Sequence, residues 1–264
     1  MYRSLIALIS LLLLSACETS PLDRRQVVLY SESQMAQQGA EAYRQMQGEL
    51  PITPNISETT YVRCVADYII EALDPSQEIV ADWEVTVFDD EQANAFALPG
   101  GKIGVYNGLL NVAFNQHQLA AVMAHEVGHV MANHSNERAS QSALRNVGLA
   151  AARVLGASDT TIEAIDYGAR LGLFLPFNRT QESEADSLGI ILMAEAGFDP
   201  TQSIALWQNM SAEGGPRPPE FLSTHPSPDS RIQELESLMD RALVVRADAQ
   251  ARGMNPDCVP GLID

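Results

Sequence analysis

The sequence predicts an α+β domain that is mainly helical and carries a small antiparallel sheet of about three strands. Three observations lead to this prediction. From Asn107 onward, apolar residues recur at helical spacing through almost the whole chain. Between residues 82 and 106, apolar and polar residues instead alternate as they do in strands, around a Pro-Gly-Gly turn. The 264 residues are 46% hydrophobic, which is enough to bury one sizeable core.

The first sixteen residues resemble a bacterial lipoprotein signal peptide. A short basic start is followed by the apolar run "LIALISLLLL" (5–14), which is too short to span a bilayer but suits a secretory signal. The segment "LSAC" that follows resembles a lipobox, so we expect lipid on Cys17 and a chain that begins there. The alternative is an ordinary signal peptide cut after Ala16. Glu18 favours the outer over the inner membrane, with the protein facing the periplasm.

The remaining elements follow from periodicity and from residues that break helices. Residues 17–32 are polar and show no periodicity, so they are predicted to be a tether. A helix is expected at 33–47 and another at 57–73, capped by Ser57. Strands are expected at 82–88, from Asn94, and at 102–106. Later helices are expected near 116–134, 137–155, 160–172, 179–197, 201–211 and 228–248.

The charge balance argues against a nucleic-acid partner. There are 34 acidic residues against 16 basic ones, for a formal net charge of -18. Such a surface repels phosphate backbones, although the charge could serve solubility alone.

The cysteines indicate a possible disulfide. If Cys17 carries lipid, Cys64 and Cys258 remain as an even pair. In an oxidising compartment these two would tie the C-terminal tail, residues 249–264, to an early helix. Two unpaired thiols are the alternative.

The segment His125-Glu126-Val127-Gly128-His129 is the strongest chemical motif in the chain. Two histidines at i and i+4 project from one face of a helix, so both imidazoles can reach a single tetrahedral zinc ion. Glu126 lies beside them, where it could act as the general base on a water molecule. The alternative is an ordinary helix that carries two histidines by chance.

A catalytic zinc needs a third protein ligand and one open position. The stretch "NRTQESEADSLGI" (178–190) offers Glu182 and Asp186, which lie at i and i+4 on another expected helix. The alternative is an acidic helix N-terminus, which the helix dipole would favour anyway. We expect Glu184 to point to another face and to be solvated, and we expect His134 to be a surface residue.

HExxH followed by E-x-x-A-D resembles the HtpX/Oma-type gluzincin zinc metallopeptidases, including their BepA- and LoiP-like periplasmic lipoprotein members. The resemblance covers residues from about 30 to 245 and implies a gluzincin-type domain over 33–248. It implies one Zn2+ per chain, held by the two motif histidines and Glu182. It further implies that Asp186 orients a metal-bound histidine.

The stretch "NAFALPGGKIGVYNGLL" (94–110) resembles the edge-strand segment of that family. An unpaired strand edge can bind an extended peptide through backbone hydrogen bonds. The substrate-binding residues implied are Asn94, Ala95, Phe96 and Ala97. An ordinary hairpin is the alternative.

The stretch "STHPSPDSRI" resembles the H-P-x-x-x-x-R segment of the same family. The resemblance implies that His225 and Arg231 lie near the active site as catalytic residues. Their role could be oxyanion stabilisation, or, for His225, a regulatory fourth metal ligand. A residue at a helix entry is the alternative for His225, and a structural ion pair is the alternative for Arg231.

These features together predict a zinc-dependent endopeptidase of the bacterial cell envelope that degrades misfolded or misassembled envelope proteins. Its expected partners are those substrates, the membrane through the N-terminal lipid, and the outer-membrane protein assembly machinery. One alternative is a non-proteolytic chaperone or assembly factor with a gated zinc site. Another is a zinc hydrolase that acts on a cell-wall amide.

Overall fold

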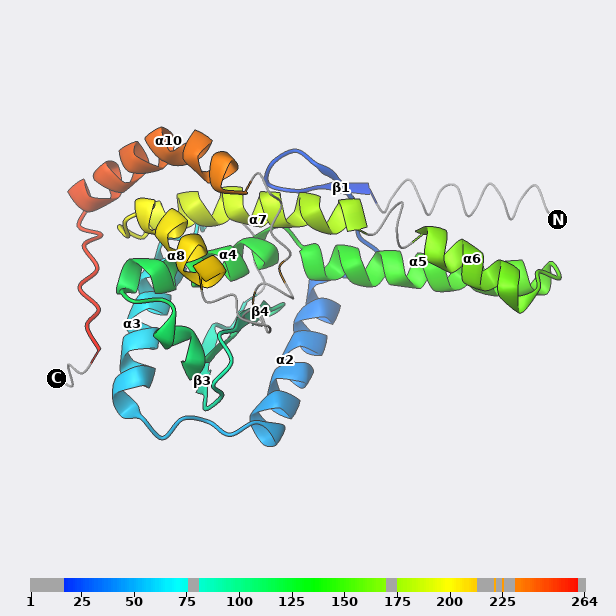
Figure 1. The fold of residues 1–264 in the computed structure, drawn as a ribbon, viewed down its shortest axis with the longest axis horizontal. Coiled ribbons are helices and arrows are strands. Elements are labelled where there is room, and N and C mark those ends of the chain that lie inside the picture. The colour runs from blue at the N-terminus through cyan, green and yellow to red at the C-terminus, as the bar shows by residue number, and fades with distance from the viewer. Residues whose placement is uncertain are drawn as a thin grey trace.

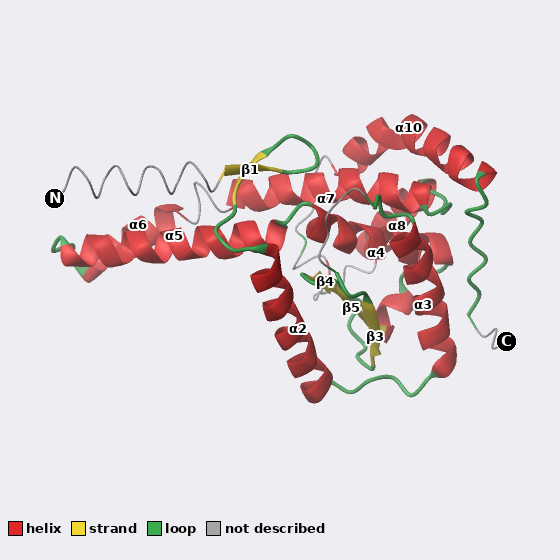
Figure 2. Cartoon of the chain, turned by 180° about the vertical axis from the view of Figure 1, so that it is seen from behind, coloured by secondary structure: helices red, strands yellow, loops and turns green. Residues whose placement is uncertain are grey.

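The computed structural model describes residues 17–75, 81–169, 175–212, 221, 225 and 231–260. The predicted signal peptide and the expected start of the last helix at residue 228 lie outside these residues. Helices pack around a small sheet, and a helical hairpin projects from one end of this body (Figures 1 and 2).

The elements confirm a mainly helical α+β domain. The first part of the chain contains β1 (Cys17–Thr19), β2 (Arg25–Val27), α2 (Glu32–Glu49), α3 (Ile56–Glu71), β3 (Glu84–Phe88), β4 (Ala95–Leu98), β5 (Lys102–Tyr106) and the short 3-10 helix η1 (Asn107–Asn111). The second part contains α4 (Gln116–Met131), α5 (His134–Val154), α6 (Asp159–Ala169), α7 (Leu175–Glu195), α8 (Thr201–Ala212) and α10 (Arg231–Ala251).

Side-chain caps set where several helices begin. The Ser31 hydroxyl accepts the Gln34 N–H and the Gln34 side chain accepts the Ser31 N–H, which completes a capping box ahead of α2. Asn55, rather than the expected Ser57, caps α3, because its side chain accepts the N–H groups of the first turn. Asn115 caps α4 in the same way.

The three-stranded sheet is mixed, so the expectation of an antiparallel sheet was wrong. Its order is β3-β5-β4, with β4 antiparallel to β5 and β3 parallel to β5. The β4–β5 hairpin turns at Gly100 and Gly101, whose φ angles of 84° and 78° are accessible to glycine. The alternation of apolar and polar residues shows which face of a strand is buried but does not show the direction of the neighbouring strand. In this sheet β5 lies between β3 and β4.

The hydrophobic core lies between the sheet and helices α3, α4, α7 and α8. Figure 1 shows α2 and α3 on either side of the sheet, with α4 and α7 running across above it. Fully buried members of this core include Val65, Val105, Met123 and Leu206.

Helices α4 and α7 approach each other at two glycines. A Cβ atom on Gly189 would lie 2.9 Å from the backbone nitrogen of His125, and one on Gly128 would lie 2.9 Å from the carbonyl oxygen of Ala185. The absence of side chains at these positions lets the two backbones touch. This contact places the HExxH helix directly against the helix that carries Glu182.

Gly189→Ala is expected to destabilise the protein by about 1–3 kcal/mol, because the added methyl group must push two packed helices apart. Gly148→Ala is the matched control, since a Cβ atom at Gly148 in α5 meets nothing within 4 Å. Gly148→Ala should raise the free energy of unfolding by about 0.5–1 kcal/mol, because alanine is more favourable than glycine in a helix interior. Urea unfolding of both variants measures the difference, and equal free energies of unfolding would contradict the close contact.

The segment predicted to be a tether is instead folded against the domain. Strands β1 and β2 form an antiparallel hairpin, and we refer to residues 17–27 as the N-terminal hairpin. The buried Gln26 side chain donates to the carbonyl of Ala132 at 2.6 Å. The partners of this segment lie more than 100 residues further along the chain, so its local composition did not reveal them. Within the described part of the chain, no helix is both long and apolar enough to cross a bilayer.

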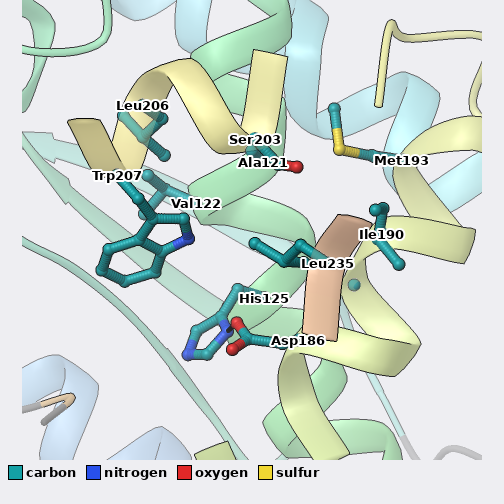
Figure 3. Close-up of a pocket in the computed structure, with 11 residues that line it drawn as sticks. Ala121, Val122, His125, Asp186, Ile190, Met193, Ser203, Leu206, Trp207 and Leu235 are labelled. Carbon is teal, nitrogen blue, oxygen red and sulfur yellow. Dashed lines mark hydrogen bonds and ion pairs between the residues drawn. The ribbon is translucent and has the colours of Figure 1, made fainter. Parts of the chain in front are cut away.

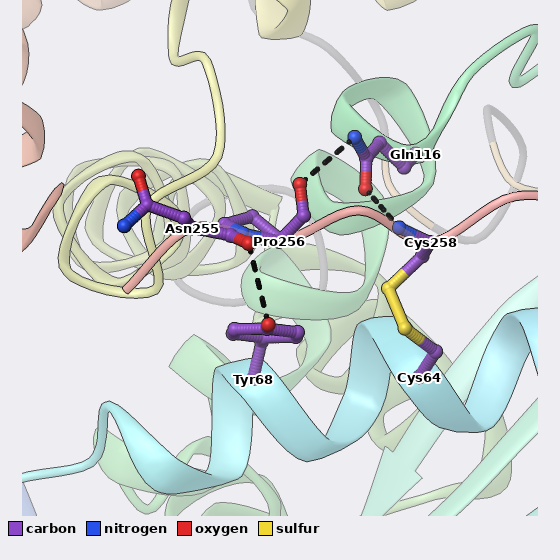
Figure 4. Close-up of a disulfide and its surroundings, with 6 residues drawn as sticks. All are labelled: Cys64, Tyr68, Gln116, Asn255, Pro256 and Cys258. Carbon is purple, nitrogen blue, oxygen red and sulfur yellow. Dashed lines mark hydrogen bonds between the residues drawn. A yellow bond between two sulfur atoms is a disulfide. The ribbon is translucent and has the colours of Figure 1, made fainter. Parts of the chain in front are cut away.

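The C-terminal tail is held by a disulfide between Cys64 of α3 and Cys258 (Figure 4). Hydrogen bonds also hold the tail at Cys258 and just before it. The side chain of Gln116 accepts the Cys258 N–H at 2.8 Å and donates to the carbonyl of Pro256 at 3.2 Å. The tail therefore joins the start of α4 to the middle of α3.

Replacing Cys64 and Cys258 by serine is expected to lower the free energy of unfolding by about 2–5 kcal/mol, because the bond closes a long loop in the unfolded chain. The two residues are separated by 194 positions. Urea unfolding with and without reductant provides the control: reductant should destabilise the wild type and leave the double variant unchanged. A wild type that is insensitive to complete reduction would contradict the prediction.

Candidate metal centre

Three side chains from α4 and α7 converge at the centre of the domain. The Nε2 atoms of His125 and His129 lie 3.2 Å apart. Glu182 places one carboxylate oxygen 3.3 Å from Nε2 of His125 and the other 3.4 Å from Nε2 of His129. Ligands around a tetrahedral ion with bonds of ~2.0–2.1 Å lie about 3.3–3.4 Å apart. The spacing of these three residues therefore fits one zinc ion.

His225 supplies a fourth donor at the same point. Its Nδ1 lies 3.3 Å from Nε2 of His125 and 3.1 Å from Oε2 of Glu182. The ligand atoms of the four residues all lie within 4.8 Å of one another, and all four side chains are buried. The corner expected to be open thus faces a protein donor in this structure. Four protein ligands are typical of a closed site, and three plus water are typical of a catalytic one.

Glu126 lies on the same helix, beside the cluster. Its carboxylate is buried, and Oε1 has no hydrogen-bond partner within the described residues. Nε2 of His225 lies 3.3 Å from that oxygen, without the geometry of a hydrogen bond. A buried carboxylate oxygen left without a partner is costly unless a ligand or water satisfies it. This observation also fits a site built to hold a metal ion and a water molecule.

Asp186 orients the ring of His125. Its Oδ1 lies 2.8 Å from Nδ1 of His125. If Nδ1 carries the hydrogen and donates it to this carboxylate, Nε2 is left with a lone pair for the metal. Figure 3 shows the carboxylate beside the imidazole, with Trp207 and Leu235 among the surrounding residues. The structure thus brings Asp186 to the position that the family resemblance implied.

Arg231 lies behind the ligands. Its guanidinium donates to Asp186 at 2.8 Å and to Glu182 at 3.4 Å, and it lies 3.6 Å from the centroid of the Trp207 ring. The side chain is fully buried, with 1% of its surface exposed. This position corresponds to the ion pair that was the alternative for Arg231. Its hydrogen bonds hold Glu182 and Asp186 in place.

The charge states of Glu182 and His129 favour cation binding. Burial acts to raise the pKa of Glu182, but hydrogen bonds with His125, His129 and His225 hold it well below its usual range. Burial acts to lower the pKa of His125, and hydrogen bonds to Asp186 and Glu182 outweigh this and raise it to about 9. Burial holds the pKa of His129 well below its usual value. Glu182 is therefore ionised and His129 neutral, as metal ligands must be, whereas the raised pKa of His125 means that this ring must release a proton when it binds a metal.

The expectation that His134 lies at the surface was wrong. The residue is completely buried, and its Nδ1 lies 2.7 Å from Nδ1 of His129. Asn133 adopts a left-handed conformation with φ of 54°, so α4 ends and α5 starts along a new direction. The helical wheel of α4 therefore does not extend to His134, which turns back towards the motif.

The expectation that Glu184 is solvated was also wrong. Only 4% of the residue is exposed, and its carboxylate accepts from Arg24 at 2.7 Å and lies 3.1 Å from Nε2 of His134. Burial acts to raise the pKa of Glu184, but hydrogen bonds from His134, Ser20 and Arg24 lower it to about 2. Because Arg24 lies in the segment predicted to be a tether, the sequence offered no partner for this carboxylate.

Strand β4 lies at the edge of the sheet, next to α4. The carbonyl of Asn94 pairs inward with the Tyr106 N–H, while the Asn94 side chain accepts the N–H of Ala95 at 3.0 Å. The ring of Phe96 stacks on Phe88 in the sheet, on the face opposite the buried Ala95 and Ala97. The expected substrate-binding segment is thus an edge strand, but Phe96 contributes to packing.

The fold and the buried His-Glu cluster define a metallopeptidase domain. A model described as Peptidase family M48 matches residues 57–239, and the chain belongs to this family. The chain is 36% identical over 225 residues to the mitochondrial metalloendopeptidase OMA1 of Schizosaccharomyces pombe, covering 83% of this chain and 64% of that protein. It is 28% identical over 231 residues to the beta-barrel assembly-enhancing protease of Escherichia coli K12, covering 82% of this chain and 46% of that protein.

These relatives confirm the predicted relation to Oma- and BepA-type metallopeptidases. The chain spans less than two thirds of the length of either relative. The matched residues include α4 and α7, which carry His125, His129 and Glu182, and they also include His225.

Proposed function

We propose that this protein is a zinc-dependent endopeptidase of the bacterial cell envelope that degrades misfolded or misassembled envelope proteins. The observation that carries the proposal is the tetrahedral spacing of His125, His129 and Glu182 beside the unpaired carboxylate oxygen of Glu126. The envelope setting is supported by the lipobox-like sequence at Cys17 and by the similarity to the Escherichia coli protease.

Each residue of the site has a separate role in the proposed reaction. One Zn2+ held by His125, His129 and Glu182 would supply a Lewis acid that polarises a peptide carbonyl and acidifies a water molecule. Glu126 would accept the proton of the attacking water and deliver it to the leaving amine. The outer edge of β4 would align the peptide backbone next to α4. For this reaction His225 must move away from the fourth corner.

Trapping in cells tests the proposed role. Glu126→Gln is expected to bind substrates without cleaving them, so it should accumulate with misfolded outer-membrane proteins that the wild type clears. The purified wild type should degrade casein, and a chelator should stop that degradation until zinc is restored. A wild type that clears such proteins no faster than Glu126→Gln would contradict the proteolytic role.

The position of His225 favours a second candidate, a non-proteolytic chaperone or assembly factor with a gated zinc site. A fourth protein ligand would keep the metal closed to water. His225→Ala distinguishes the two candidates, because it opens the corner. A gated peptidase should then cleave casein faster than the wild type, whereas a chaperone should cleave it in neither form.

A further inference from the structure

A second set of buried polar side chains lies behind His129. Nδ1 of His129 is 2.7 Å from Nδ1 of His134, and Nε2 of His134 is 3.1 Å from Oε2 of Glu184. The same carboxylate accepts from Nε of Arg24 at 2.7 Å and from the Ser20 hydroxyl. An unbroken chain of hydrogen bonds thus leads from the N-terminal hairpin to one ligand of the proposed metal.

The direction of these hydrogen bonds suits metal binding. Glu184 accepts hydrogen bonds from Arg24 and Ser20, so as an ionised carboxylate it also accepts from His134. When Nε2 of the neutral His134 ring donates, Nδ1 becomes an acceptor, and Nδ1 of His129 must then be the donor. The Nε2 atom of His129 is left with a free lone pair. This is the tautomer that binds a metal.

Arg24 holds this arrangement to the rest of the domain. Its two terminal nitrogens donate to both oxygens of Glu137 in α5 at 2.8 and 2.7 Å, and its Nε donates to Glu184 in α7. The Arg24 side chain is 19% exposed, whereas the two glutamates are only 2% and 4% exposed. One arginine from the hairpin therefore lies between two buried carboxylates. Such paired, planar contacts fix geometry better than single ones.

We propose that the N-terminal hairpin is part of the support of the metal centre, with Arg24, Glu184 and His134 acting as positioning residues for His129. This inference rests on the proposed function, since it concerns the same metal. Docking of the hairpin and binding of the metal then strengthen each other, as linkage requires. The hairpin begins at Cys17, the proposed site of lipid attachment, so Arg24 lies only seven positions after the proposed anchor.

Metal affinity of the purified full-length chain tests the inference without any protease assay. Arg24→Ala and Glu184→Gln are compared with Arg25→Ala, a matched control in the same hairpin whose side chain is exposed. Zinc dissociation constants are measured by competition with a chromogenic chelator. The first two variants should bind zinc about 10–100-fold more weakly, as is typical when a group supporting a ligand is lost. The control should match the wild type.

Two further measurements separate positioning from general damage. Visible absorption of the Co2+-substituted protein should shift in Glu184→Gln but not in Arg25→Ala, because the geometry around the ion changes. In the wild type, zinc should slow amide hydrogen exchange in residues 20–27, and this protection should be absent in Glu184→Gln. The exchange experiment on the wild type remains decisive if a variant does not fold.

Zinc affinities of Arg24→Ala and Glu184→Gln within twofold of the Arg25→Ala control would overturn the inference. Equal rates of amide hydrogen exchange in residues 20–27 of the wild type with and without zinc would also overturn it. A wild type that binds no zinc at all would instead overturn the proposed function itself, so the two failures are distinguishable.

Discussion

Glu126→Gln is expected to lower kcat/KM for peptide cleavage by about 10²–10⁴-fold, which is the usual contribution of a general base. The substitution keeps the size of the side chain and removes its ability to accept a proton. Zinc content should stay at one ion per chain, because Glu126 is not among the residues whose ligand atoms converge on the metal position. Loss of activity with metal retained would distinguish a proton-transfer role from a structural one.

Initial rates on a fluorogenic casein substrate, together with metal analysis of the same samples, provide the measurement. Glu163→Gln serves as the control, because Glu163 is an exposed glutamate of α6 that lies outside the cluster. The control should cleave at the wild-type rate. If Glu126→Gln also cleaved at that rate, Glu126 could not be the base.

Arg231→Ala is expected to lower the free energy of unfolding of the metal-free protein by about 3–5 kcal/mol. The substitution removes the buried cation that pairs with Asp186 and Glu182, and both carboxylates stay in the interior. Contact with the Trp207 ring is lost as well. Arg231→Lys should recover only part of the loss, since one ammonium group cannot reproduce the planar contacts of a guanidinium.

Urea unfolding at pH 7 with a chelator present measures this effect. Arg241→Ala is the matched control, because Arg241 lies on the same helix, α10, and is exposed. The control should change the free energy of unfolding by no more than about 0.5 kcal/mol. Equal stability of Arg231→Ala and Arg241→Ala would show that the buried carboxylates do not depend on this arginine.

Much of the metal centre was predictable because its ligands are encoded locally. The i, i+4 spacing of His125 and His129 places both rings on one helix face whatever surrounds the helix. Glu182 and Asp186 follow the same rule on α7. His225 and Arg231 were expected near the site only through the family resemblance, and their actual geometry depends on how α10 and the preceding segment pack against α7.

Two of the errors involve residues that lie far apart in the chain, and a third arises from a local turn. The direction of β3 depends on β5 inserting beside it, which alternation does not encode. Glu184 is buried by Arg24, which lies 160 positions earlier. The third error concerns His134, because the left-handed turn at Asn133 was not predicted. The contact between His134 and His129 depends on the direction that this turn gives to α5.

The sequence by itself determined the helical class of the domain, the i, i+4 pairs of polar residues on α4 and α7, and the two cysteines that could form a bond. These properties depend on the periodicity of a helix and on the chemistry of single residues. Only the tertiary structure decided that His225 lies beside the other three donors and that hydrogen bonds connect the hairpin to His129. Both depend on pairing between charged or polar groups whose partners become neighbours only when the chain folds.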